Sequence, residues 1–128
     1  MENLPATIAD AGPKALSEVF AGMQAARPGG RDLSIAGDFN LVPTNLQAAV
    51  NMQVRTQGSG STLNNQGQRT NNLYDHLVLD AAVTSEMTGD PQVIDVLGVA
   101  ATPLEFFRTV SDHPPIVVSL RSSGPDDD

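Results

Sequence analysis

The spacing of apolar residues along the chain predicts both helices and strands. Residues 14–26 place apolar side chains at positions i, i+3, i+4 and i+7, which form one stripe on an α-helix. An Arg-Pro-Gly-Gly sequence ends this helix, and residues 33–36 then predict a short buried strand. Residues 73–79 alternate in the way that a second strand requires, and residues 116–120 predict the last strand.

The segments between these elements carry weaker signals. Short elements are expected at four places: a helix over 45–52, a strand at 54–56, a strand at 83–87 and one helical turn over 103–108. Residues 93–97 are apolar without a clear period, so helix and strand both stay open there. Two prolines make residues 110–115 a loop, because a central strand cannot contain them. The pattern predicts an α+β fold with one mixed sheet flanked by helices.

The 128 residues suffice for one domain with an apolar core, and no repeat or linker divides them. We expect this domain to span residues 1–121, with an irregular lead-in over residues 1–12, followed by a disordered acidic tail over residues 122–128. The absence of cysteine excludes disulfides and thiolate metal sites. No apolar run is long enough to span a bilayer, and the N-terminus has no signal-peptide pattern. The chain carries no visible targeting segment, and the cytoplasm is its default location.

The formal net charge of -8 leaves two interpretations open. One is an acidic surface that keeps the protein soluble, and the other is a set of carboxylates that converge on a divalent cation. The overall charge repels a polyanion such as nucleic acid. A nucleic-acid substrate would therefore require a metal ion, a few well-placed arginines or a partner chain.

Two polar residues follow the first strand, at Asp38 and Asn40. In an extended segment, residues two apart point to the same side, so both side chains would emerge together while Phe39 turns into apolar surroundings. The edge beyond the carboxyl ends of strands is where open α/β sheets place their chemistry. Taken alone, an Asp-X-Asn sequence is more typical of a turn or a cap.

Further polar residues occur near the later strands. Asp75 lies on a strand face that is otherwise formed by leucines, and a carboxylate there is costly to bury without a partner. His76 lies on the opposite face and is interpreted as a structural or rim residue. Asp112 and His113 lie in the proline-rich loop before the last strand, a pair that alone is more typical of a surface.

Residues 57–72 are almost wholly polar and are open to two interpretations. They form either a mobile surface loop or a loop of amide and hydroxyl donors beside an active site. In the second case Arg55, Arg69 and Asn72 are the candidates for binding a phosphate group of the substrate.

Three motifs together resemble the endonuclease/exonuclease/phosphatase superfamily, which has the deoxyribonuclease-I-like fold. They are Gly-Asp-Phe-Asn at 37–40, Tyr-Asp-His at 74–76 and Ser-Asp-His-Pro-Pro at 111–115. The resemblance covers roughly residues 13–120 and only the C-terminal half of the family domain, because the sequence has no apolar strand ending in Gln-Glu to supply the family's metal-binding glutamate. It implies half of a deoxyribonuclease-I-like α/β sandwich.

The resemblance also implies a role for each motif residue. Asp38 would position and help to deprotonate the attacking water, and Asn40 would hold a phosphate oxygen. His113 would contact the scissile phosphate, with its imidazole oriented by Asp75. Asp112 would lie at the metal site, where oxygen ligands favour Mg²⁺ or Mn²⁺.

The activity that these roles imply is divalent-metal-dependent hydrolysis of a phosphodiester or phosphomonoester, with nucleic acid among the candidate substrates. Three forms of the protein are open. The chain is the second half of a split phosphodiesterase and needs an N-terminal half, or it is a non-catalytic half-domain that serves as a binding or structural unit, or two copies pair through the exposed sheet face as a homodimer.

Overall fold

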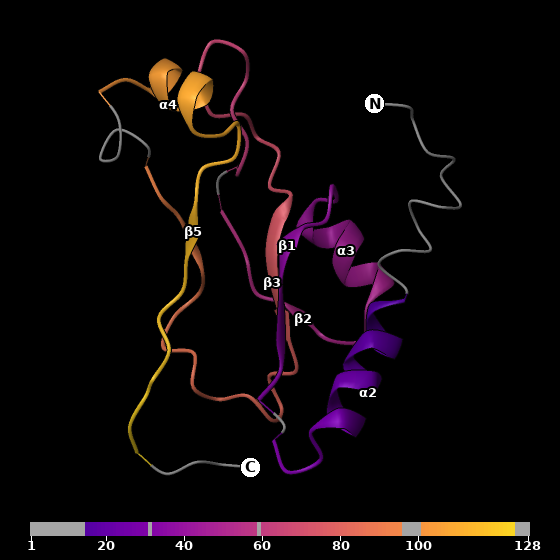
Figure 1. The fold of residues 1–128 in the computed structure, drawn as a ribbon. Coiled ribbons are helices and arrows are strands. Elements are labelled where there is room, and N and C mark those ends of the chain that lie inside the picture. Colours follow the sequence, from indigo (N-terminus) through magenta and orange to yellow (C-terminus); the bar gives the residue numbers. More distant parts are fainter. Residues whose placement is uncertain (1–14, 31, 59, 96–100, 125–128) are drawn as a thin grey trace.

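The structure is a computed structural model that describes residues 15–30, 32–58, 60–95 and 101–124, so the expected lead-in over residues 1–12 lies outside the described residues, as does the end of the acidic tail. The fold is mixed α/β (Figure 1). The helices of the described residues are α2 (Leu16–Ala26), α3 (Pro43–Ala49) and α4 (Pro103–Thr109). The strands are β1 (Ser34–Asp38), β2 (Gln53–Val54), β3 (Asp75–Leu79), β4 (Gln92–Val93) and β5 (Ile116–Val117).

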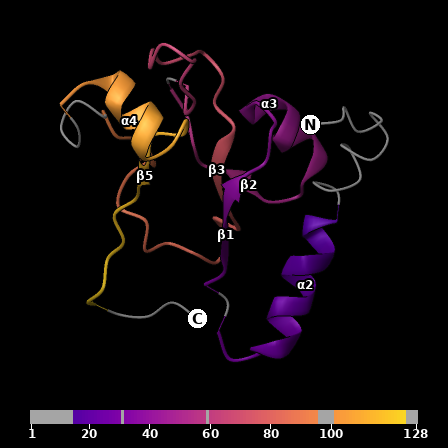
Figure 2. The ribbon, with the colours of Figure 1, turned by 45° about the horizontal axis from the view of Figure 1, so that its top comes forward.

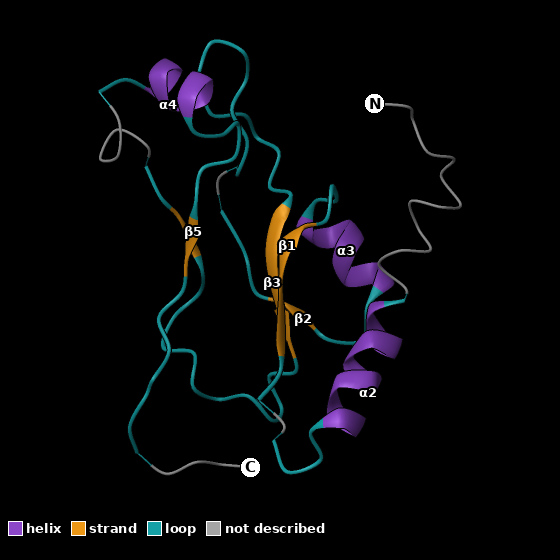
Figure 3. Cartoon of the chain, in the orientation of Figure 1, coloured by secondary structure: helices purple, strands orange, loops and turns teal. Residues whose placement is uncertain are grey.

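The strands form two small antiparallel sheets instead of the single mixed sheet that the sequence predicts. One sheet has the order β1-β3-β2, and β4 pairs with β5 in the other. Helices α2 and α3 lie on one side of the three-stranded sheet, and the β4–β5 ribbon lies on its other side (Figures 1 and 2). Helix α4 lies at one end of the ribbon (Figure 3). The helices therefore cover only one face of the larger sheet.

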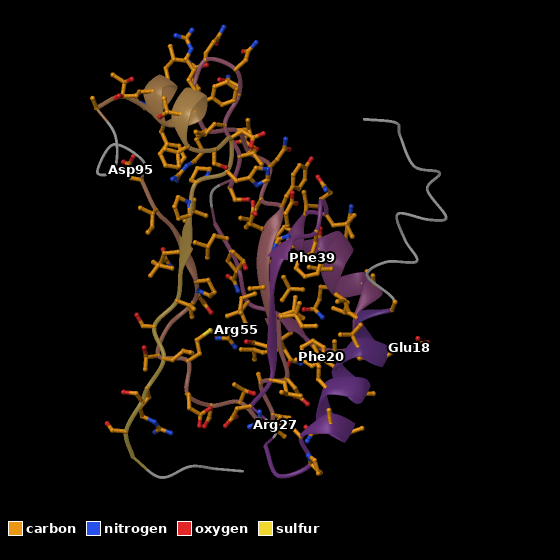
Figure 4. The ribbon with its side chains drawn as sticks, in the orientation of Figure 1. Glu18, Phe20, Arg27, Phe39, Arg55 and Asp95 are labelled. Atoms are coloured by element: carbon orange, nitrogen blue, oxygen red, sulfur yellow. The ribbon has the colours of Figure 1, made fainter. Side chains whose placement is uncertain are left out.

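The main core lies between this sheet and helices α2 and α3. Its buried members are apolar residues from both layers: Phe20, Leu46, Val50, Met52 and Val78. Figure 4 shows Phe20 directed from α2 toward the sheet, whereas Glu18 on the same helix points away. Burying a side chain of this size is worth about 1.5–3 kcal/mol. The apolar stripe predicted for this helix is confirmed in part, because Val19 is 47% exposed.

The register of β1 and β3 determines which residues share a face. Ile35 lies opposite Val78, and Asp38 lies opposite Asp75. Because successive side chains in a strand point to opposite faces, the first pair faces the helices and the second pair faces the β4–β5 ribbon. The predicted alternation in residues 73–79 is confirmed, whereas β1 is not a buried strand, since Ser34 and residues 36–38 are exposed.

The polar segment 60–72 packs against α4 through a second, smaller core. Leu63 and Phe106 are buried there, with Phe107 packed against them. Gly67 has a φ of 78°, and a Cβ at this position would lie 2.5 Å from the backbone nitrogen of Leu104. Glycine therefore allows the loop to approach the helix closely. Of the two interpretations of this loop, these contacts favour a defined conformation.

Some expected elements differ from those observed. Only the end of residues 83–87 pairs as a strand would: the backbone N–H groups of Val83 and Thr84 donate to the carbonyl of Asp80 and form a turn, whereas Met87 forms an isolated bridge with Leu120. Helix α3 begins at Pro43, two residues before the expected start, because proline fits the first turn of a helix. None of the helices in the described ranges is long and apolar enough to cross a membrane.

The ribbon of β4 and β5 is less regular than the predicted strand over residues 116–120. Gln92 pairs with Val117, whereas the next paired position joins Met87 to Leu120. Residues 88–91 separate the two pairings on the β4 side, whereas residues 118–119 separate them on the β5 side. The longer stretch contains Asp90 and Pro91. Proline cannot donate to the ladder, so the regular pairing stops there.

Candidate active site

Three polar side chains meet at the end of the β1–β3 pair. The Nδ1 atom of His113 lies 2.7 Å from Oδ2 of Asp75, and its Nε2 atom lies 3.8 Å from Oδ2 of Asp38. The first distance is a hydrogen bond, and the second is an electrostatic contact that is too long for one. Asp75 is the most buried of the three, with a side chain 19% exposed against 27% for His113 and 38% for Asp38. The structure thus brings together residues from all three motifs.

Ser61 binds the same oxygen of the Asp75 carboxylate as His113. Its hydroxyl is fully buried and donates to Oδ2 of Asp75 over 2.6 Å. The hydroxyl oxygen of Ser61 in turn accepts hydrogen bonds from the backbone N–H groups of Tyr74 and Asp75, at 3.0 and 3.1 Å. Gly60 allows this placement, because a Cβ there would collide with the backbone of Thr70 at 2.1 Å. Sequence reasoning missed Ser61, since its Gly-Ser-Gly-Ser context resembles a flexible linker.

Asp38 and Asn40 do not continue an extended strand as predicted. Asn40 has a φ of 53°, and its backbone N–H donates to Oδ1 of Asp38 over 2.9 Å. The segment is therefore a tight Asx-type turn, in which asparagine tolerates the left-handed conformation better than most residues. Phe39 turns toward the helix side and packs against the main core, as expected (Figure 4).

The loop before β5 presents His113 to the two carboxylates. The backbone N–H of His113 donates to the hydroxyl of Ser111 over 2.9 Å, and Leu63 donates its N–H to the carbonyl of Asp112 over 2.7 Å. Pro114 is buried directly after the histidine. These contacts fix the loop at both ends, while the side chain of Asp112 stays on the exposed surface beside His113.

The surrounding charges raise the pKa of His113 above its ordinary value of 6.5. Partial burial of the imidazole lowers this pKa, but the hydrogen bond to Asp75 and the negative charges of Asp75, Asp38 and Asp112 outweigh that effect. The raised pKa extends the imidazolium form to higher pH, and in that form Nδ1–H is held by Asp75 and Nε2–H is directed toward Asp38.

A cavity of 310 Å³ adjoins this cluster, between β1–β3 and the chain leading into β5. Asp75 and His113 line it together with apolar residues of both layers, including Leu77 and Ile116. A second hollow of 210 Å³ shares Leu77 and Val118 with the first. The ribbon-side face of the sheet is thus hollowed along much of its length.

Each of the three candidate phosphate-binding residues has a described hydrogen bond or ion pair with residues other than Asp38, Asp75 and His113. Arg55 forms an ion pair with Asp90 at 2.9 Å and lies on the ribbon side of the sheet (Figure 4). Arg69 donates to the backbone carbonyl of Ile94 over 3.1 Å. Asn72 is exposed, and its backbone binds Ser61 and Thr70.

The donor set for a metal ion is incomplete in the described part of the chain. No group of three or more histidine or carboxylate side chains there is arranged to hold an ion. The oxygen atoms of Asp38, Asn40 and Asp112 suit Mg²⁺ in kind, because hard cations prefer oxygen ligands, but the group as described does not form a metal site.

Comparison of the chain with models of known protein families found no match, and comparison with curated proteins found none either. The family resemblance therefore depends on the three sequence motifs.

Proposed function

We propose that the chain is the catalytic half of a divalent-metal-dependent phosphoester hydrolase of the endonuclease/exonuclease/phosphatase type. The observation that carries the proposal is the contact of His113 with two carboxylates, at 2.7 Å to Asp75 and 3.8 Å to Asp38. Asp75 and His113 lie 38 positions apart in the sequence, and Asp38 comes from a third segment. The three motifs together, not any one of them alone, indicate this chemistry. An Asp-oriented histidine beside a second, more exposed carboxylate suits acid–base chemistry on an ester.

In this proposal each residue has a separate task. Asp38 positions the attacking water and accepts its proton as the water oxygen bonds to phosphorus and the ester P–O bond breaks. His113 donates from Nε2 to a phosphate oxygen and stabilises the charge that develops there, while Asp75 fixes the imidazole. The Asn40 carboxamide holds a second phosphate oxygen. The raised pKa of His113 favours the protonated form that this role needs.

Magnesium or manganese would supply neutralisation of the phosphate charge when bound. Asp112 is the proposed ligand from this chain, since its carboxylate is exposed next to His113. The described residues do not complete a metal site, so the proposal includes further ligands from an N-terminal half of the domain. The acidic net charge of -8 makes a small phosphate ester a better substrate for this chain alone than duplex nucleic acid.

The finer fold assignment, half of a deoxyribonuclease-I-like sandwich, is part of the same proposal. It is supported by the uneven covering of the three-stranded sheet, whose helices lie on one side only (Figure 3). The hollows of 310 and 210 Å³ on the other face contain apolar Leu77 and Val118. Leu77 belongs to the sheet and Val118 to the chain that follows β5, so the hollows lie between the two layers. Apolar surface left open there is suited to packing against a further element.

A non-catalytic binding or structural unit, with a homodimer as one form of it, is the second candidate. It is favoured by large apolar side chains on the ribbon: Val117 is 48% exposed and Leu120 is 60% exposed. Exposed apolar residues on a short antiparallel ribbon are typical of an association surface.

Hydrolysis of bis-p-nitrophenyl phosphate with Mg²⁺ or Mn²⁺ distinguishes the two candidates. The hydrolase proposal expects release of nitrophenol by the chain, or by the chain with a supplied N-terminal half, and a loss of at least about a hundredfold in Asp38→Asn and His113→Gln. Asp32→Asn is the matched control, because this exposed residue precedes the same strand and lies away from the cluster. Equal rates in all variants, or none in any preparation, would favour the binding unit.

A further inference from the structure

His76 contacts both neighbours of Asn40. Its Nε2 atom lies 2.6 Å from the backbone carbonyl of Leu41, and its ring centroid lies 6.0 Å from that of Phe39. The side chain is on the helix face of β3 and only 2% exposed, so these contacts are shielded from solvent. Asn40 itself points away from this interior and is exposed.

The hydrogen-bond partner determines which nitrogen of the ring carries the proton. A carbonyl oxygen only accepts, so Nε2 of His76 is the donor to Leu41. The Nδ1 atom is buried, and no hydrogen-bond partner for it is found among the described residues. The described contacts of the ring are therefore the hydrogen bond from Nε2 to Leu41 and the ring contact with Phe39, and both partners belong to the turn that contains Asn40.

That turn needs to be held from outside. Asn40 adopts a φ of 53°, a conformation that side chains other than glycine rarely populate without support from the surroundings. Phe39 is fixed by its N–H, which donates to the carbonyl of Tyr74 over 2.9 Å, and Leu41 is fixed by His76. With both neighbours fixed, the Asn40 N–H stays on Oδ1 of Asp38 at 2.9 Å.

We propose that His76 is a positioning residue that holds the Phe39–Leu41 turn and thereby orients the Asp38 carboxylate and the Asn40 carboxamide. Its role in catalysis rests on the proposed function, whereas its role in holding the turn does not. His76 lies next to Asp75 in β3, so one dipeptide supports both sides of the site: Asp75 orients His113 on the ribbon face, and His76 orients the Asn40 turn on the helix face.

Amide hydrogen exchange of the full chain tests the proposal without any substrate. His76→Phe keeps an aromatic ring against Phe39 but removes the donor, and we expect exchange at the Asn40 amide to rise about tenfold or more. The Leu77 amide, which donates to the hydroxyl of Thr56, reports on general loosening and should keep its rate. His76→Gln places a side-chain N–H near the position of Nε2 and should restore slow exchange at Asn40. Equal acceleration at Asn40 and Leu77, or none at Asn40, would overturn the proposal.

Two further measurements keep the test independent of the other claims. If His76→Phe does not fold, long-range ¹H–¹⁵N spectra of the unmodified chain still decide whether Nε2 carries the proton, and a proton on Nδ1 alone would refute the contact with Leu41. Where hydrolysis is measurable, kcat should fall about tenfold or more in His76→Phe with KM nearly unchanged, and His76→Gln should recover it. Faster exchange at the Asn40 amide in His76→Phe, in a chain that hydrolyses nothing, would support the positioning role of His76. It would count only against the proposed function.

Discussion

Asp38 and Asp75 lie directly opposite each other in the antiparallel pair of β1 and β3. Like charges in such cross-strand positions destabilise a sheet, because their side chains project from the same face only a few ångströms apart. His113 contacts both carboxylates, at 3.8 and 2.7 Å, and its positive form offsets this repulsion. The arrangement on which the proposed function depends therefore also links folding stability to the charge of one histidine.

Replacing His113 with glutamine should destabilise the chain more at low pH than at high pH. The folded-state pKa of His113 is raised, so its contribution is complete below the unfolded value of 6.5 and is lost as pH rises through the higher folded pKa. We expect His113→Gln to cost about 1–2 kcal/mol at acidic pH and less at alkaline pH, after allowing for partial solvent exposure. Urea unfolding of both proteins at pH 5.5 and pH 9 measures the difference.

The Asp38→Asn background provides the control for this effect. Removing one of the two opposed charges should reduce the cost of His113→Gln by at least about 0.5 kcal/mol at pH 5.5, as a double-mutant cycle would report. A cost that is equal at both pH values and in both backgrounds would show that His113 acts through packing alone.

Ser61→Ala should be among the more damaging single changes in the polar loop. The substitution removes the donor to Asp75 and leaves two partly buried backbone N–H groups, those of Tyr74 and Asp75, without their acceptor. We expect a loss of about 2–3 kcal/mol in the free energy of unfolding, measured by urea titration. Ser34→Ala, at an exposed position of β1, should change stability by less than about 0.5 kcal/mol. Similar values for the two variants would contradict the assigned hydrogen bonds.

Comparing the stability of Gly67→Ala with that of Gly58→Ala distinguishes the cost of a steric collision from the cost of backbone strain. Both glycines have positive φ, at 78° and 97°, so alanine is strained at either position, at a cost of about 1–3 kcal/mol. Only Gly67 also faces the backbone of Leu104, whereas a Cβ at Gly58 would meet nothing within 4 Å. The thermal midpoint should therefore fall further in Gly67→Ala. An equal fall in both would mean that the loop does not pack on α4 in this way.

The elements with strong local signals could be predicted from the sequence. The apolar stripe placed α2 within two residues of its observed start, and the two prolines correctly excluded a strand from residues 110–115. The alternation in residues 73–79 placed Asp75 on one face and His76 on the other, which is what separates their surroundings in the structure. The spacing of apolar residues and the positions of prolines determine structure within a few residues, so both can be interpreted without the rest of the chain.

The errors occur where a side chain binds the backbone or a distant segment. A turn at Asp80 replaces the first part of the strand expected over residues 83–87, and the Asp38 carboxylate closes a turn at Asn40 where an extended segment is expected. Ser61 reaches Asp75 across 14 positions, and no local pattern distinguishes such a serine from one in a linker. The first two contacts are local turns that the strand pattern does not encode, whereas the Ser61 contact and the division into two antiparallel sheets depend on tertiary packing.

Chelation gives the last prediction, because the proposed chemistry needs a divalent cation that the described residues do not hold by themselves. Any hydrolysis of bis-p-nitrophenyl phosphate should vanish in EDTA and return when Mg²⁺ or Mn²⁺ is added in excess. Asp112→Asn should raise the metal concentration needed for half-maximal activity, about tenfold or more, since it weakens one anionic oxygen ligand. Asp95→Asn is the control, as this exposed residue lies apart from the cluster beyond the end of β4 (Figure 4). Activity that persists in EDTA would refute the metal-dependent assignment, and it would leave the Asp38–His113–Asp75 cluster to be explained by acid–base catalysis alone.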